Sequence, residues 1–158
     1  MISHNSKPLD FDWISQGKLA VGRAPSKEEH FSFLKSKKIE YILSVCHPNE
    51  NRIPSKVESE FRLFSFPLKD HNSKEEPTEK EYVKAIKLLI DLTQRGVVYI
   101  HCLAGIERSP LTCIGWLILV KGLDPDDAYE YCKEIHPSTS PLLSHFKILK
   151  KAISKMKF

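Results

Sequence analysis

The chain lacks the features that would place it among membrane, secreted or repetitive proteins. Its apolar runs are far shorter than a membrane span, and its first residues lack the charged-then-apolar pattern of a secretion signal. Repeats, low-complexity segments and linkers are missing too. A chain of 158 residues with 41% apolar content can bury one substantial core. We therefore expect one domain over residues 1–158, with its core at about 13–151.

Cysteine is scarce, and its placement excludes two kinds of site. The four cysteines are Cys46, Cys102, Cys113 and Cys132. They are few for a disulfide scaffold, and they lack the paired spacing of a zinc site. We expect neither a metal nor another cofactor. Cys113 and Cys132 fall at apolar helical positions, which predicts that both lie in the core.

The chain has only a small excess of positive charge, and this excess is concentrated near the C-terminus. The net charge is +4, and five lysines without any acid lie between His136 and Phe158. We expect these lysines to form the solvated face of a last helix. The predicted inward residues of that helix are Leu142, Leu143, Phe146, Leu149 and Ile153. This interpretation leaves no need for a nucleic-acid or membrane partner.

Apolar strand-like runs alternate with helical patterns along the chain. Strands are predicted at 19–22, 39–45, 61–66 and 97–100, and helices at 26–37, 79–95, 109–121, 124–135 and near the C-terminus. Thr78-Glu79-Lys80-Glu81 is a capping box that begins the second helix. The pattern is typical of an α/β fold with a mostly parallel central sheet and helices on both faces.

The most informative segment runs from His101 to Ser109. It follows a buried strand and opens an apolar helix, so its free backbone N–H groups and the helix dipole favour an anion. Cys102 supplies a nucleophile there, and Arg108 supplies a planar two-pronged donor for phosphate oxygens. Gly105 permits close backbone approach or a positive φ. The helix from 109 to 121 is apolar on nearly every side, which predicts that it is buried and aims the loop rigidly.

The helix dipole alone cannot keep Cys102 ionised. A free cysteine is only a few per cent thiolate at neutral pH, and the dipole contributes at most about 2 kcal/mol. We expect converging amide hydrogen bonds and the charge of Arg108 to supply the rest.

His101-Cys102-x-x-Gly105-x-x-Arg108-Ser109 resembles the signature of the cysteine-dependent protein tyrosine phosphatase superfamily at every fixed position. The small size of the chain, and Asp70 at 32 positions before Cys102, resemble its dual-specificity branch. The resemblance implies a phosphotyrosine protein phosphatase-like fold, a phosphocysteine on Cys102 and a general acid at Asp70. It implies a Ser109 hydrogen bond to the sulfur and clamping of phosphate by Arg108. The implied phosphate-binding amides are those of Leu103, Ala104, Gly105, Ile106, Glu107 and Arg108.

Three neighbouring residues leave alternatives open. Asp70 follows a strand-like run and is favoured as the acid, although Asp in a polar stretch is also a common turn residue. Glu107 departs from the usual small, neutral or basic residue before the arginine. It would point outward, where it shapes the rim, pairs with a basic neighbour or is simply solvated. His101 is expected to be neutral and to support the loop from beneath.

Cys46 ends the strand at 39–45, and parallel strands present their carboxyl ends together. We hypothesise that it forms a disulfide with oxidised Cys102; simple packing is the alternative.

Three functions fit the loop. The first is a monomeric, metal-free protein phosphatase acting on phosphotyrosine, with phosphoserine and phosphothreonine as further candidates. The second acts on inositol lipids, phosphoglucan or RNA 5′ ends, but the loop carries none of the extra lysines that highly charged headgroups favour. The third is a non-catalytic phosphate-binding module, which the intact Cys102, Arg108 and Asp70 disfavour. Dependence on a free thiolate predicts a reducing compartment, with the cytoplasm as the default.

Overall fold

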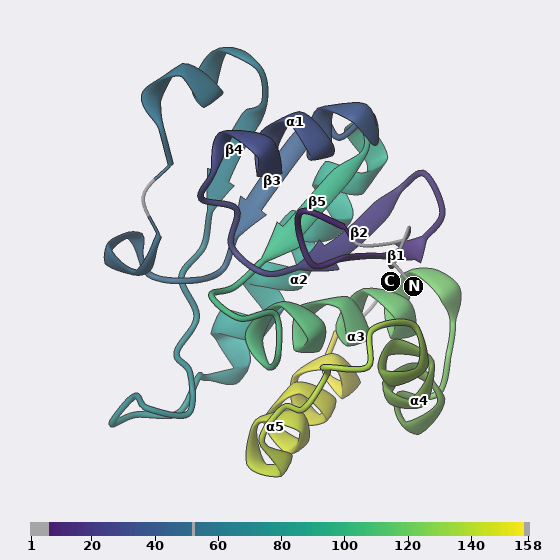
Figure 1. Cartoon of the computed structure of the whole chain (residues 1–158). Coiled ribbons are helices and arrows are strands. Elements are labelled where there is room, and N and C mark those ends of the chain that lie inside the picture. The colour runs from purple at the N-terminus through teal and green to yellow at the C-terminus, as the bar shows by residue number, and fades with distance from the viewer. Residues whose placement is uncertain (1–6, 52, 157–158) are drawn as a thin grey trace, which may run out of the picture.

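A five-stranded sheet forms the centre of the molecule. The computed structural model describes residues 7–51 and 53–156. The strands lie in the order β1-β2-β5-β3-β4, with β1 antiparallel to β2 and all other neighbours parallel (Figure 1). Their bounds are β1 Phe11–Ser15, β2 Leu19–Gly22, β3 Tyr41–Ser44, β4 Arg62–Ser65 and β5 Val98–His101.

Helices cover both faces of this sheet, as the sequence predicts. The helices are α1 Glu28–Ser36, α2 Glu79–Arg95, α3 Arg108–Lys121, α4 Pro125–Ile135 and α5 Leu143–Ser154. Two short 3₁₀ helices, η1 Pro48–Glu50 and η2 Ser55–Ser59, lie between β3 and β4. Figure 1 shows α1 on one face of the sheet and the other α-helices on the opposite face. Each face has its own buried apolar cluster, so the α/β class is confirmed.

Strand β1 is an element that the sequence does not predict. Its pairing with β2 shifts register between Trp13 and Ser15. This irregularity interrupts the alternation of apolar and polar residues by which a half-buried strand is recognised. Phe11 and Ile14 are nevertheless buried, so β1 contributes side chains to the core.

Helix α3 is the buried central helix that the sequence predicts. Its first ten residues, 108–117, are all buried, and it packs against α2, α4 and α5. The Trp116 indole donates a 3.0 Å hydrogen bond to the Thr93 hydroxyl on α2. A Cβ at Gly115 would come within 2.4 Å of Ile86, so glycine permits this close helix contact. Cys113 and Cys132 are fully buried, as expected.

The expectation for the last helix is wrong at its beginning. Leu142 and Leu143 are 40% and 68% exposed, whereas Phe146, Leu149 and Ile153 are buried. Leu142 precedes the first helical turn, and a spacing of six residues turns Leu143 about 120° away from Leu149. His145 takes the inward position instead and is only 3% exposed.

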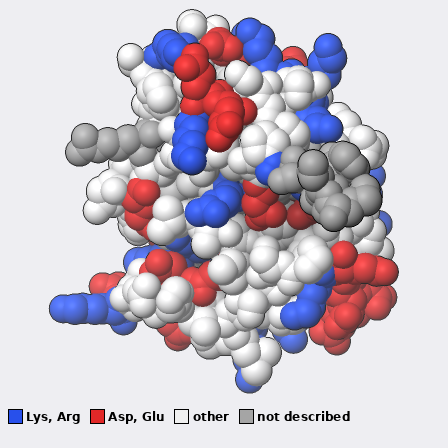
Figure 2. All heavy atoms as spheres, viewed as in Figure 1, with Lys and Arg blue, Asp and Glu red and all other residues white. Residues whose placement is uncertain are grey.

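The lysines of α5 lie on its solvent side or at its margin, as expected. Lys147, Lys151 and Lys155 are exposed, and Lys150 places its ammonium 4.8 Å from the centre of the Phe146 ring. Lys157 lies outside the described residues. On the face drawn in Figure 2, acidic side chains gather over α4, while lysines and arginines are scattered. Within the described residues, no helix is both long enough and apolar enough to cross a membrane.

Parallel pairing brings the segments that follow four strands to one edge of the sheet. Ser44 of β3 and Gly22 of β2 are both in register with His101 of β5, and Ser65 of β4 is in register with Ser44. The segments that follow these strands therefore meet the loop after β5. The most informative part of the sequence lies at this carboxyl edge.

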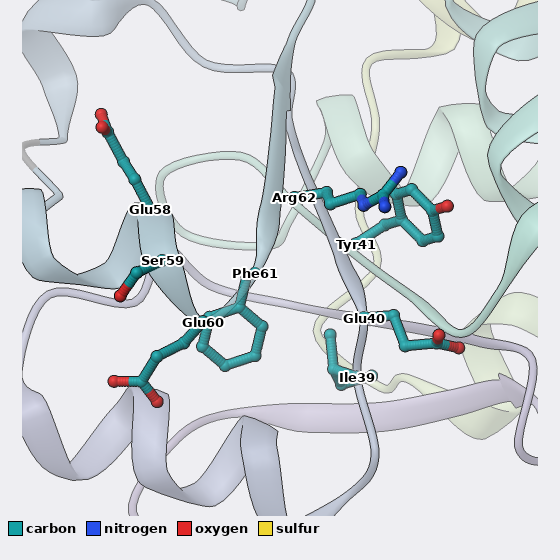
Figure 3. Close-up of a pocket in the computed structure, with 8 residues that line it drawn as sticks. All are labelled: Ile39, Glu40, Tyr41, Glu58, Ser59, Glu60, Phe61 and Arg62. Carbon is teal, nitrogen blue, oxygen red and sulfur yellow. The ribbon is translucent and has the colours of Figure 1, made fainter.

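A surface pocket of about 460 Å³ lies at the opposite end of β3 and β4. Figure 3 shows the Arg62 guanidinium beside the Tyr41 ring, with the Glu40 and Glu60 side chains extending in different directions. Both carboxylates already have partners, the Val97 N–H for Glu40 and the Lys35 ammonium for Glu60. The pocket is remote from the residues that the sequence singles out.

Candidate active site

The loop between β5 and α3 turns its carbonyl groups outward. The Leu103 carbonyl accepts from the Ala24 N–H at 3.0 Å, and the Ile106 carbonyl accepts from the Ser140 N–H at 2.8 Å. The Gly105 carbonyl accepts from the His136 ring at 2.6 Å. Within residues 7–51 and 53–156, the N–H groups of 103–108 have no protein acceptor. This pattern leaves the loop amides available to an anion.

Gly105 occupies a position that other residues would strain. Its φ is +73°, in the left-handed region. A Cβ there would also lie 2.9 Å from the carbonyl carbon and oxygen of Gly22. The loop therefore packs directly on the end of β2, and both constraints point to glycine.

Cys102 lies at the bottom of the loop, with predicted partners around it. The residue is 2% exposed, and its Sγ lies 3.2 Å from the Ser109 Oγ. His101 is fully buried beneath, with Nδ1 at 3.1 Å from the Cys102 carbonyl oxygen. Burial lowers the pKa of His101 to about 4. A neutral, supporting His101 agrees with this environment.

Arg108 is held by a carboxylate that the sequence analysis does not identify. Its Nη1 and Nη2 each lie 2.9 Å from an oxygen of Glu50, which belongs to η1. Nη1 also donates to the Leu68 carbonyl at 3.3 Å. The hydrogen bond from Arg108 holds the pKa of Glu50 below its usual value. Glu50 therefore fixes the guanidinium as an ionised, two-pronged partner.

The Nε donor of this guanidinium has no partner in the described part of the protein. Among the described residues, the Arg108 Nε is buried without a hydrogen bond. Such a group costs free energy unless a ligand satisfies it. An oxygen of a bound phosphate would do so, next to the free loop amides.

Asp70 lies close to Arg108 but is held by its own loop. Its Oδ2 is 3.9 Å from Arg108 Nη2. Its Oδ1 accepts from the Asn72 N–H at 3.0 Å and lies 3.3 Å from the Ser73 hydroxyl. The structure brings Asp70 to the site and also gives it the turn contacts of the alternative interpretation. The two interpretations are compatible.

Glu107 connects the phosphate loop to the Asp70 loop. Its Oε1 accepts from the His71 N–H at 2.9 Å and lies 3.0 Å from His71 Nδ1. That hydrogen bond and the charge of Glu107 raise the pKa of His71. Of the alternatives for Glu107, pairing with a basic neighbour describes this arrangement.

Cys46 is buried at the end of β3, beside the nucleophile loop. Its Sγ lies 3.2 Å from the Ser44 hydroxyl. The preceding residue, Val45, donates its N–H to the His101 carbonyl at 2.9 Å. Burial raises the pKa of the Cys46 thiol, so this cysteine is protonated at neutral pH.

Comparisons with known proteins agree with this geometry. The family "Dual specificity phosphatase, catalytic domain" matches residues 21–155. The dual specificity protein phosphatase Mpk3 of Drosophila melanogaster is 27% identical over 140 residues, which cover 88% of this chain and 32% of that protein. The putative tyrosine phosphatase 197R of Invertebrate iridescent virus 6 is 27% identical, with 80% of this chain and 48% of that protein covered. The chain thus spans half or less of these relatives.

Solved structures share the fold at low sequence identity. The active form of Tk-PTP has a TM-score of 0.79 at 17% identity, covering 93% of this chain and 98% of that one. PTPMT1 in complex with PI(5)P has a TM-score of 0.77 at 20% identity, covering 92% and 95%. With the family match over most of its length, the chain belongs to the family of dual specificity phosphatase catalytic domains.

Proposed function

We propose that the chain is a protein phosphatase that hydrolyses phosphotyrosine, with phosphoserine and phosphothreonine as further substrates. The observation that carries the proposal is the set of unused donors around Cys102. The loop amides of 103–108 and the Arg108 Nε have no protein acceptor in the described part of the chain. Together they match the equatorial oxygens of a phosphoryl group.

In the first step, the Cys102 sulfur attacks phosphorus and the bond to the ester oxygen breaks. Arg108 and the loop amides take up the charge of the three other oxygens. Asp70, in its protonated form, gives its proton to the leaving oxygen. The products are a phosphocysteine and the free phenol or alcohol.

In the second step, water attacks phosphorus and the bond to sulfur breaks. Asp70, now ionised, accepts the proton of the attacking water. The Ser109 hydroxyl, 3.2 Å from Sγ, donates to the departing thiolate. Inorganic phosphate leaves and the thiolate is restored. The cycle uses groups of this chain and water alone.

An apolar mouth favours a protein substrate over a highly charged headgroup. Leu103 and Ile106, whose N–H groups are among the free donors, are 45% and 38% exposed. Their side chains offer contact to an aromatic ring or to apolar neighbours of a phosphorylated residue. The second candidate, an inositol lipid phosphatase, draws support from the fold that the chain shares with PTPMT1 in its complex with PI(5)P. The absence of lysine from this loop disfavours it.

The deciding experiment compares the intact protein with Cys102→Ser on phosphotyrosine peptides, phosphoserine peptides, phosphoinositides, phosphoglucan and 5′-phosphorylated RNA. We expect release of phosphate from the phosphotyrosine peptides, and none above background with the variant. Capture of phosphorylated proteins by Cys102→Ser would then identify substrates. Turnover by the variant would contradict the nucleophile assignment. A preference for phosphoinositides would replace the protein substrate with the lipid.

Cys46 is the proposed redox partner of the nucleophile. A peroxide would oxidise the Cys102 thiolate to a sulfenic acid, releasing hydroxide or water. The Cys46 sulfur would then attack that sulfur, forming a disulfide and releasing water. The product is reducible, so the nucleophile is protected from irreversible oxidation.

Peptide mass spectrometry after mild peroxide treatment tests this step, with Cys46→Ser as the comparison. We expect a cross-linked peptide joining Cys46 and Cys102, and less complete recovery of activity in the variant after reduction. Cys113→Ser, which changes another buried thiol, serves as the matched control. Failure to find the cross-link would reduce Cys46 to a packing residue. A mechanism based on a free thiolate also favours a reducing compartment, the cytoplasm by default.

A further inference from the structure

His136 is a buried histidine with an oxygen acceptor at each ring nitrogen. It follows α4 and is fully buried. Its Nδ1 lies 2.6 Å from Asp12 Oδ2 on β1, and its Nε2 lies 2.6 Å from the Gly105 carbonyl oxygen in the phosphate loop. A carbonyl oxygen can only accept, and so can an ionised carboxylate. Both ring nitrogens must therefore donate, which requires the imidazolium form.

The other groups around the ring favour that charged form. Asp10 places a carboxylate oxygen 4.0 Å from Nε2, and the Ser138 hydroxyl lies 3.0 Å from the same nitrogen. The Lys7 ammonium lies 3.4 Å from Asp12 Oδ1. On α4 itself the titratable neighbour is Cys132, whose carbonyl accepts from the His136 N–H at 2.8 Å. Burial alone would lower the pKa of His136, but the hydrogen bonds to Asp12 and Gly105 and the two carboxylate charges raise it.

The same segment holds the phosphate loop at a second point. The Ser140 N–H donates to the Ile106 carbonyl at 2.8 Å. Residues 136–140 thus secure two of the carbonyls whose outward direction leaves the amides free for an anion. The bond at Gly105 differs from the one at Ile106, because its donor is a group that can lose its proton.

We propose that His136, as an imidazolium paired with Asp12, is a positioning residue that fastens the phosphate loop at Gly105 in its anion-binding conformation. The inference rests on the proposed function, since it assigns a regulator of affinity to that same site. A neutral ring has one N–H, so either Asp12 or the Gly105 carbonyl would lose its histidine donor. Only a longer contact would then remain, from Lys7 to Asp12 at 3.4 Å or from the Ser138 hydroxyl to the Gly105 carbonyl at 3.5 Å. Both hydrogen bonds of the ring are therefore present at low pH, and one of them is lost as the pH rises through the raised pKa of His136. Anion affinity should fall over the same interval.

Sulfate is the suitable probe, because its charge stays constant from pH 5 to 9. The starting protein is Cys102→Ser, His71→Gln, which cannot turn over and lacks the second histidine of the site whose pKa is raised. Calorimetry would give sulfate affinity across the pH range, and nitrogen NMR would report the protonation of the His136 ring. We expect both ring nitrogens to be protonated at pH 6, and sulfate affinity to fall in step with deprotonation.

Three further substitutions in this protein make the result specific. His136→Gln should weaken sulfate binding about tenfold or more at pH 6 and flatten its pH dependence, because one charged hydrogen bond to the loop is lost. Asp12→Asn, at a half-buried position, should move the midpoint to lower pH, and it keeps the test available if His136→Gln does not fold. His145→Gln changes a histidine that is also buried, on α5, and should retain the pH dependence.

The outcomes separate this inference from the proposed function. A neutral His136 ring at pH 6, or a sulfate affinity indifferent to Asp12→Asn, would overturn the positioning role while leaving phosphatase activity possible. Dependence of sulfate affinity on His136 without any Cys102-dependent turnover would support the positioning role and refute the enzyme. In the active protein, His136→Gln should lower kcat for an activated aryl phosphate by up to about 10²-fold.

Discussion

The phosphate loop and the Asp70 loop meet at the same sheet edge, but they are held in different ways. The carbonyls of the phosphate loop bond to groups outside it, from the end of β2 and from the segment after α4. Asp70 instead bonds to Asn72 and Ser73 within its own turn. The Asp70 loop is joined to the phosphate loop by the His71 N–H bond to Glu107, and the Asp70 carboxylate lies 3.9 Å from Arg108 Nη2. The phosphate loop is therefore held by tertiary hydrogen bonds, whereas the hydrogen bonds of the Asp70 carboxylate are local.

This difference suits the two loops to different roles in catalysis. Stabilisation of the transferring phosphoryl group depends on donors that need no rearrangement. Proton donation must serve leaving groups of different shape, for which a locally held loop is suited. Changes in the phosphate loop should thus affect all substrates alike, whereas changes in the Asp70 loop should depend on the leaving group.

Asp70→Asn should produce the largest effect and should reveal that dependence. We expect kcat to fall about 10²–10⁴-fold for a phosphoserine peptide, because a basic alkoxide leaves poorly without a proton. An aryl phosphate with an acidic phenol should lose much less. Steady-state kinetics on both substrates measure the contrast. Equal losses would transfer the acid role away from Asp70.

Gly105→Ala should lower activity by about 10²-fold on both of these substrates. The added Cβ would lie 2.9 Å from the Gly22 backbone at a φ of +73°, and small displacements of positioning groups are costly. Gly17→Ala provides a control, since its φ is +72° but nothing lies within 4 Å of the added atom. A loss confined to the poor leaving group would contradict the proposed rigidity.

Glu50→Gln should cost about tenfold in kcat/KM, mainly through KM. One charged hydrogen bond to the Arg108 fork is weakened, so the guanidinium is less well oriented toward phosphate. Glu60→Gln is a matched control, because Glu60 pairs with Lys35 on the surface instead. If both substitutions have the same small effect, Glu50 is not needed to orient Arg108.

His71→Gln should have the smallest effect, less than about fivefold, because the His71 side of its pair with Glu107 is 53% exposed. The hydrogen bond and charge of Glu107 raise the pKa of His71. The ionic contact is thus fully present below the ordinary histidine pKa and is lost as the pH rises through the raised one. Rates at pH 6 and pH 8.5 should therefore differ less in the variant. A large loss at both pH values would show that the connection between the loops is essential.

Local signals were sufficient for the loop, the capping box at Thr78 and the central helix. Each depends on residues that are neighbours in the sequence, and the predicted bounds of the two helices agree with those observed to within one residue. Glu50 and His136 carry no comparable signal. Glu50 lies in a polar stretch, 58 residues before Arg108, and His136 meets Asp12 across 124 residues.

The sequence signal that could have indicated Glu50 is the rule that segments following parallel strands meet at the carboxyl edge of the sheet. It indicates that the segment after β3 reaches the site, but it does not choose among the polar residues there. Strand β1 was missed because a register shift disrupts its alternation. Leu142 and Leu143 were predicted to face inward because they are apolar, but the prediction neglected the direction in which each position of the helix points.

Strand β1 bears directly on how this protein should be prepared in the laboratory. The family match begins at residue 21, and a recombinant fragment trimmed to that limit would omit β1 and the first two residues of β2. Val98 and Tyr99 of β5, which pair with those two residues, would then lie at an open sheet edge, and an open edge with unpaired backbone groups favours aggregation. The fragment would also lack Asp12. Poor solubility and weak turnover in a shortened sample would then reflect the trimming rather than the native enzyme.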